Sequence, residues 1–250
     1  MKNHVFVNHC VDFDELLDPK NWVKGKTVDR FLLILDKQSK TEEAKLRVDF
    51  ANYQDYTDNE TCPAYFGMGV EWLAWHFINH YGRNFNIEGV QMTDSEGSSE
   101  EDYGVDGIGR TIIDSKNKYR TTNRRAIQGS EVYLQVKGTL NRMKEYTPND
   151  GSRLPNFGMN AMASAIVSNK AYQARYVVFT TGKGLHYSME KMSRGLLEVI
   201  CYSDIKAHTD QDFVFLNRLR SSVGLPEIPL EFSKGDAEGL TQFEGLDDES

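Results

Sequence analysis

The segment Glu131-Val-Tyr-Leu-Gln-Val-Lys137 carries the clearest structural signal in this 250-residue chain. Its residues alternate with the period of two that is typical of a β-strand. One face of this strand holds the apolar side chains Val132, Leu134 and Val136. Gln135 and Lys137 lie side by side on the opposite face, although a strand covered by helices is expected to be apolar on both faces. The pattern therefore indicates either an exposed sheet face or a polar site within the sheet.

The sequence on both sides of this strand predicts an α/β domain. Apolar runs and periodicities predict strands over 85–92, 103–114, 131–138 and 174–181, and helices over 65–81, 157–170, 188–199 and 213–223. From residue 65 the order is helix, three strands, helix, strand and helix, which favours a mixed sheet flanked by helices. Two further strands are predicted over 31–36 and 46–53, within an N-terminal accessory extension of residues 1–60. The main domain covers 61–230, and 231–250 form an acidic tail that we expect to be mobile.

Composition excludes several protein classes. Hydrophobic residues make up 39% and charged residues 26% of the chain, which is typical of soluble globular proteins. No apolar run reaches the roughly 18–20 residues of a membrane helix, and the N-terminus does not resemble a signal peptide. The three cysteines, Cys10, Cys62 and Cys201, are far apart and form no CxxC pair, which argues against a disulfide scaffold or a cysteine zinc site. We therefore expect a cytoplasmic protein with no membrane partner.

The net charge of −8 is distributed unevenly along the chain. Residues 231–250 contain seven acidic residues and one lysine, so the other 230 residues carry a net charge of only −2. Residues 94–106 contain six carboxylates and no basic residue. Five cations follow within ten residues, namely Lys116, Lys118, Arg120, Arg124 and Arg125. Such segregated charge can bind an anionic polymer locally in spite of the overall negative charge.

Asp106 adds a carboxylate to the polar residues of the decisive strand. It lies between Gly104 and Gly107, and glycines allow an unusual backbone conformation and the close approach of a ligand. If the strands over 103–114 and 131–138 are neighbours, Asp106 lies close to Gln135 and Lys137. Carboxylate, amide and carbonyl oxygens beside an amine suit a divalent metal and an activated water. The alternative is a turn aspartate in a glycine-rich loop beside an exposed sheet face.

These residues, in this order of elements, resemble the PD-(D/E)xK nuclease superfamily. Asp106 followed by Gln135-Val-Lys137 is similar to the Mrr-like branch, in which glutamine commonly replaces the second acid, although Val105 stands at the position of the proline. The resemblance covers residues 65–225 and implies a restriction-endonuclease-like core. Glu71 would be the helix-borne acid of the family, and it falls at the margin of the apolar face of the 65–81 helix. The alternative for Glu71 is a solvated acid on the helix surface.

The resemblance implies a magnesium-dependent endonuclease that hydrolyses phosphodiester bonds in DNA. Mg²⁺, for which Mn²⁺ would substitute, would be bound by Asp106, Gln135, the carbonyl of Val136 and Glu71. Lys137 would position the attacking water and offset the charge that builds up on phosphorus. Asp106, Gln135, Lys137 and Glu71 are thus the predicted catalytic residues. Because cleavage of both strands usually needs two active sites, the resemblance also implies a homodimer.

The predicted contacts with nucleic acid are basic residues near this site. They are Lys116, Lys118, Arg120, Arg124 and Arg125, extended by Arg142 and Lys144 directly after the decisive strand. The alternative for the basic run is a solvated hairpin tip.

Three alternatives remain at this stage. One is a non-catalytic nucleic-acid-binding or interaction protein on the same fold. Another is a metal-independent scaffold protein in which Gln135 and Lys137 are only exposed. His76 and His80 have the spacing of a zinc pair, but the same helical wheel places them far from Glu71, and packing or surface roles are favoured for both.

Overall fold

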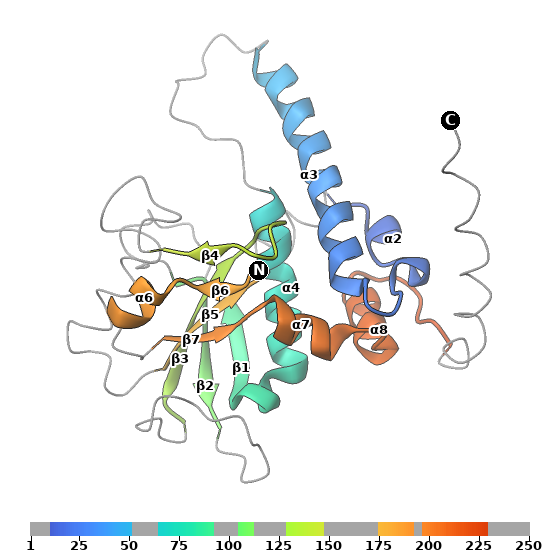
Figure 1. The fold of residues 1–250 in the computed structure, drawn as a ribbon. Helices are drawn as coiled ribbons and strands as arrows, with labels where there is room; N and C mark the ends of the chain where they lie inside the picture. The colour runs from blue at the N-terminus through green and yellow to red at the C-terminus, as the bar shows by residue number, and fades with distance from the viewer. Residues whose placement is uncertain are drawn as a thin grey trace.

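The computed structural model describes residues 11–51, 65–92, 105–112, 129–147, 175–192 and 197–229, and it contains a five-stranded mixed sheet (Figure 1). The strand order is β1-β2-β3-β5-β7. The strands are β1 (Ile87–Met92), β2 (Gly107–Thr111), β3 (Glu131–Lys137), β5 (Arg175–Thr180) and β7 (Leu197–Ile200). The pairs β1–β2 and β2–β3 are antiparallel, whereas β3–β5 and β5–β7 are parallel. The predicted mixed α/β sheet is confirmed, as are the four strands predicted for it.

Helix α4 (Tyr65–Tyr81) packs against β1 and β3 and has the predicted bounds. It lies directly beside the sheet in Figure 1, with α3, α7 and α8 on the same side. Val70 and Phe77 of α4 are fully buried in one cluster with the apolar face of β3, that is, Val132, Leu134 and Val136. Burial of each such side chain contributes roughly 1.5–3 kcal/mol relative to exposure. The alternation read in β3 therefore identifies its core face correctly.

The strands predicted over 31–36 and 46–53 are wrong, because α3 spans Thr27–Ala51. Residues 52 and 53 lie outside the described residues. The buried side chains at the start of α3 recur at helical spacing: Val28, Phe31, Leu32, Leu35 and Ser39. Leu33, in the middle of the apolar run, is 59% exposed. The short run FLLIL has the length of a buried strand, but the spacing of the buried residues over three turns is that of a helix, and α3 packs on α4 and α7.

The helix predicted over 188–199 is also wrong. The segment contains the short helix α6 (Tyr187–Met192) and the beginning of strand β7, which pairs with β5. A buried ion pair joins these two strands, since the Arg175 guanidinium binds the Glu198 carboxylate through contacts of 2.7 and 2.9 Å. Arg175 also donates to the carbonyls of Phe85 and Asn86, so it ties the sheet to the turn before β1. These long-range contacts favour a strand where local periodicity suggested a helix.

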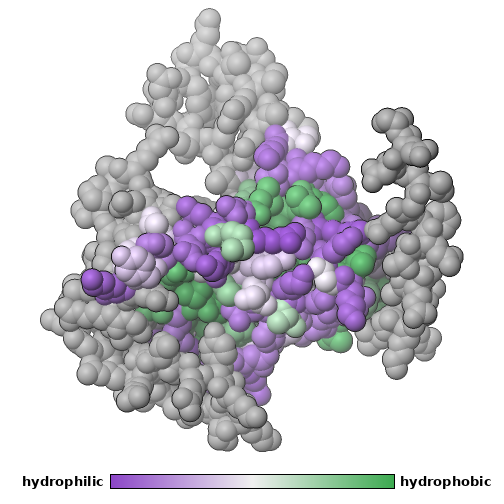
Figure 2. Space-filling model, viewed as in Figure 1, coloured by the Kyte–Doolittle hydropathy of each residue, from purple (hydrophilic) through white to green (hydrophobic). Residues whose placement is uncertain are grey.

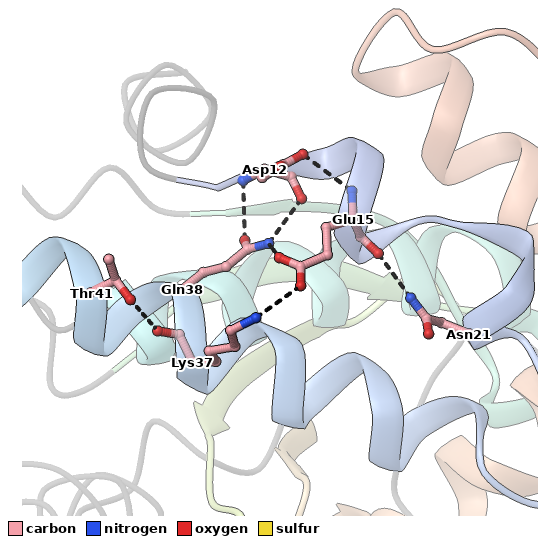
Figure 3. A network of polar contacts seen from close by, with 6 residues as sticks. All are labelled: Asp12, Glu15, Asn21, Lys37, Gln38 and Thr41. Atoms are coloured by element: carbon pink, nitrogen blue, oxygen red, sulfur yellow. Dashed lines mark hydrogen bonds and ion pairs between the residues drawn. The ribbon is translucent and has the colours of Figure 1, made fainter. Parts of the chain in front are cut away.

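Polar contacts join the N-terminal helix α2 (Phe13–Leu16) to α3, and the Asn21 side chain of η1 (Pro19–Asn21) donates to the Glu15 carbonyl of α2 (Figure 3). The Gln38 side chain accepts from the Asp12 backbone amide and donates to the Asp12 carbonyl, at 3.0 and 3.1 Å. Lys37 forms an ion pair with Glu15 at 3.2 Å. Leu16 and Leu17 are buried in the same apolar cluster as α4. The boundary near residue 60 stays a prediction.

The remaining described elements are η2 (Gly82–Phe85), β4 (Glu145–Tyr146), β6 (Gly184–Leu185), α7 (Tyr202–Thr209) and α8 (Phe213–Ser222). Strands β4 and β6 form a separate parallel pair, and α8 confirms the helix predicted over 213–223. The helix predicted over 157–170 and the acidic tail of 231–250 lie outside the described residues.

Among the helices that the structure describes, none is long and apolar enough to cross a membrane. The described surface in Figure 2 is mainly hydrophilic, with smaller apolar areas.

Candidate active site

Asp106 lies immediately before β2 and is fixed against β3. Its backbone amide donates to the carbonyl of Leu134 at 2.8 Å, and its Oδ2 accepts from the amide of Val136 at 2.5 Å. Gly107 pairs with Leu134 at the end of the β2–β3 ladder. Asp106 is therefore held at the end of β2, with its carboxylate at the Val136 backbone. A shared site of Asp106, Gln135 and Lys137 stays a prediction.

The Val136 backbone is oriented toward Asp106. In an extended strand, the N–H and C=O of one residue point to the same edge. Since the Val136 amide donates to the Asp106 carboxylate, the Val136 carbonyl is directed to the β2 side of β3. Strand β2 begins only at Gly107. The carbonyl therefore points past the end of β2, beside the Asp106 carboxylate.

Gln135 is the most unusual residue of this group. It has no exposed surface, and neither amide atom, Nε2 or Oε1, meets a hydrogen-bond partner within the described parts of the chain. An amide buried without a partner costs about 1–3 kcal/mol on the scale of protein mutations. Buried polar groups of native proteins are nearly always paired, so an exception requires an explanation such as an unbound ligand or ion.

Glu71 and Lys137 are the two other predicted site residues. The first turns of α4 lie against the end of β3. A Cβ added to Gly138 would come within 2.9 Å of Cγ2 of Val70. Burial raises the pKa of Glu71 to about 7, with a further contribution from the negative charge of Asp106 and an opposing one from Lys137. The structure therefore brings Glu71, Asp106 and Lys137 within electrostatic range of one another. Their roles in catalysis stay predictions.

The predicted metal ligands are of several chemical kinds. Across the described residues there is no group of three or more His, Cys, Asp and Glu side chains that could hold a metal. The predicted site instead comprises two carboxylates, the amide oxygen of Gln135 and the backbone carbonyl of Val136. These are hard oxygen donors, which suit Mg²⁺ better than a transition metal that prefers nitrogen or sulfur.

The two helix histidines pack among aromatic rings. His76 is 3% exposed and lies between Trp72 and Trp75, with ring centroids at 4.6 and 4.4 Å. His80 contacts the rings of Tyr81 and Phe215. These contacts agree with the packing role favoured for both residues over a zinc pair.

The predicted nucleic-acid contacts are only partly described. Lys116, Lys118, Arg120, Arg124 and Arg125 lie outside the described residues. Lys144 stands over the ring of Tyr146, 5.5 Å from its centroid. Arg142 contacts Asp29 of α3 and the ring of Tyr202 of α7. No motif in the sequence indicated Asp29 or Tyr202, which lie 113 and 60 residues away from Arg142.

Comparisons with known proteins add little to this geometry. No family model matches the sequence, and no curated protein matches it. A solved structure that matches is the MspJI restriction endonuclease in complex with a 27-mer oligonucleotide, at 13% sequence identity and a TM-score of 0.31. The match covers 76% of this chain, which spans 42% of that one. A similarity at this TM-score does not establish a common fold, so the function of the chain has to be inferred from its own residues.

Proposed function

We propose that this protein is a metal-dependent endonuclease that hydrolyses phosphodiester bonds in DNA, on a restriction-endonuclease-like core. The observation that supports it best is the fully buried amide of Gln135, which has no hydrogen-bond partner among the described residues. A sheet that only needed a packed core would have an apolar residue at this position. A polar group held there at a cost in stability points to a ligand of the site.

The residues fit a magnesium ion. Asp106 and Glu71 would supply carboxylate oxygens, Gln135 would supply Oε1, and Val136 would supply its backbone carbonyl. Mg²⁺ binds such oxygens, and Mn²⁺ would substitute for it. When bound, the ion would polarise a phosphoryl oxygen and lower the pKa of a bound water. An ion would also explain why an amide oxygen is buried here with no donor among the described residues.

Lys137 would act on the water and on the phosphate. Lys137 is half-buried, lies two residues from Gln135 on the same face of β3, and is within electrostatic range of Glu71. From this position it would hold the attacking water and stabilise the negative charge that develops on the phosphoryl oxygens. Asp106, fixed by the Val136 amide, would keep its carboxylate still while the bond to phosphorus forms.

A second candidate is a non-catalytic nucleic-acid-binding or interaction protein on the same fold. The observation that favours it is the mixed donor set, because Gln135 leaves the site with only two carboxylates. Such a protein has no need of Lys137. Its affinity for DNA would survive loss of the Asp106 charge.

The test is cleavage of supercoiled plasmid and of single-stranded DNA in Mg²⁺, Mn²⁺ or EDTA. Asp106→Asn keeps an oxygen acceptor for the Val136 amide while it removes the charge, and Lys137→Met keeps the length of the side chain. Glu88→Gln, on the exposed side of β1, is the matched control. We expect metal-dependent cutting by the wild type and the control, and a loss of at least about 100-fold in the other two. DNA binding without cutting in any metal, with affinity unchanged in both variants, would favour the non-catalytic candidate.

A further inference from the structure

The loop that follows Lys137 is held in one conformation by several contacts. The amide and carbonyl of Thr139 both bind the Thr181 hydroxyl at 2.7 Å. Asn141 then forms a turn, since its side chain accepts from the Met143 amide and its carbonyl accepts from the Lys144 amide, at 3.0 and 2.9 Å. The backbone around Arg142 is therefore fixed relative to the end of β3.

The side chain of Arg142 is oriented by residues from two other elements. Its Nε binds Oδ1 of Asp29 at 2.8 Å, and its guanidinium lies 5.5 Å from the ring centroid of Tyr202. The Tyr202 hydroxyl donates to the same Asp29 oxygen at 2.8 Å. Asp29 lies in the first turn of α3 and is only 11% exposed. Asp29 of α3 and Tyr202 of α7 thus hold the Arg142 guanidinium in one orientation.

Tyr202 is a dependable donor in this arrangement. Burial, the hydrogen bond to Asp29 and the charge of Asp29 raise the pKa of Tyr202 to about 12. The hydroxyl therefore keeps its proton at any pH at which the protein would work. Asp29 in turn stays where the Nε of Arg142 can bind it.

The Arg142 side chain is 54% exposed, and neither Nη1 nor Nη2 has a hydrogen-bond or ion-pair partner in the described part of the chain. This distinguishes Arg142 from Lys183, which is paired with Glu145, and from Lys206, which donates to the carbonyl of Gly25. A fixed guanidinium with two free Nη groups has the geometry that binds a phosphate through two parallel hydrogen bonds.

We propose that Arg142 is a preorganised clamp for a backbone phosphate of the bound nucleic acid, with Asp29 and Tyr202 as its positioning residues. This inference rests on the proposed nuclease function. Five residues of chain reach at most roughly 17 Å, so the Arg142 backbone lies within that distance of Lys137. Because Arg142 is held before the ligand arrives, binding orders little of its side chain.

The test is binding of a fluorescein-labelled 20-nucleotide strand and a 20-base-pair duplex, followed by anisotropy in EDTA at several salt concentrations. Arg142→Ala should weaken binding at least about 10-fold and reduce the slope of log K against log salt by about 1. Arg142→Lys should keep the slope and still lose affinity, since lysine cannot bind Asp29 and present a fork at once. Arg218→Ala, an exposed arginine of α8, is the matched control for loss of one charge.

Asp29→Asn separates the orientation of Arg142 from a purely electrostatic effect of Asp29, because the two predict opposite changes in affinity for the oligonucleotide. Asp29→Asn removes a negative charge near the phosphate, so electrostatics alone would strengthen binding. We expect it instead to weaken binding several-fold, because the guanidinium loses its orientation. The loss should disappear in the Arg142→Ala background, where there is nothing left to orient. Tyr202→Phe tests the same step with a smaller change and keeps the ring.

Several results would overturn the inference. Stronger binding by Asp29→Asn would mean that Asp29 competes with the phosphate for Arg142. An Arg142→Ala variant that loses no more affinity than Arg218→Ala would remove the clamp but leave the proposed nuclease intact. If the wild type binds neither oligonucleotide, the clamp and the proposed function both fail.

Discussion

Replacing Glu71 with glutamine should remove a pH-dependent loss of stability from the metal-free protein. Burial and the charge of Asp106 raise the pKa of Glu71 from 4.5 to about 7 in the folded state, despite the opposing effect of Lys137. Between these two values the folded protein binds more protons than the unfolded chain. The contribution of Glu71 to the free energy of unfolding is therefore fully present below pH 4.5 and is lost as the pH rises toward 7. At about 1.4 kcal/mol per pH unit, the loss amounts to about 3 kcal/mol.

The assay is urea denaturation in EDTA at intervals from about pH 5 to about pH 8. The wild type should lose about 2–3 kcal/mol relative to Glu71→Gln across this range, because the amide does not ionise. Glu88→Gln, which changes an exposed carboxylate of β1, should follow the wild type. If Glu71→Gln and the wild type give parallel curves, Glu71 is not held near Asp106 in a buried setting, and its place in the site is wrong.

Three further substitutions test the packing around the site by urea denaturation. Gln135→Met should raise the free energy of unfolding by about 1–3 kcal/mol and abolish metal-dependent cleavage; an unchanged stability would mean that the amide has a partner. Arg175→Met should lower it by about 3–5 kcal/mol, because Glu198 is left as a buried charge, and a loss below about 1 kcal/mol would contradict this. Gly109→Ala should cost about 1–3 kcal/mol, since the new Cβ would lie 2.7 Å from Val90 Cγ2; a neutral effect would show that the two strands can separate.

The sequence was sufficient to predict four of the five strands of the sheet, β1, β2, β3 and β5, and the helix α4 that packs on them. The β3 alternation and the spacing of α4 each reflect burial on one side of one element, which is a local property. Prediction from local patterns failed where burial depends on residues that are distant in the sequence. Phe31 and Leu35 form a helical stripe only when Val28 and Ser39 are included in the window, and β7 is a strand because β5 pairs with it.

The candidate site was predictable in part for the same reason. Asp106 reaches β3 because β2 and β3 are neighbours, as the sequence predicts, and its carboxylate accepts from the Val136 amide. That Asp106, Gln135 and Lys137 form one site stays a prediction. The complete burial of Gln135 could not be predicted, because alternation alone is equally compatible with an exposed polar face. Asp29 and Tyr202 gave no signal, since a single aspartate and a single tyrosine in helices resemble ordinary surface residues until the fold brings them to Arg142.

Glutamine at position 135 has a consistent electrostatic explanation. Asp106 already contributes to the raised pKa of Glu71, about 7, so the two carboxylates repel each other in a poorly solvated site. A glutamate at 135 would add a third acid at a position with no solvent exposure, and much of its charge would be lost to protonation near neutral pH. The amide supplies an oxygen without that charge. With Lys137 counted, two ionised carboxylates leave the site at −1, so a divalent cation would bring it to +1, which favours an anionic phosphodiester.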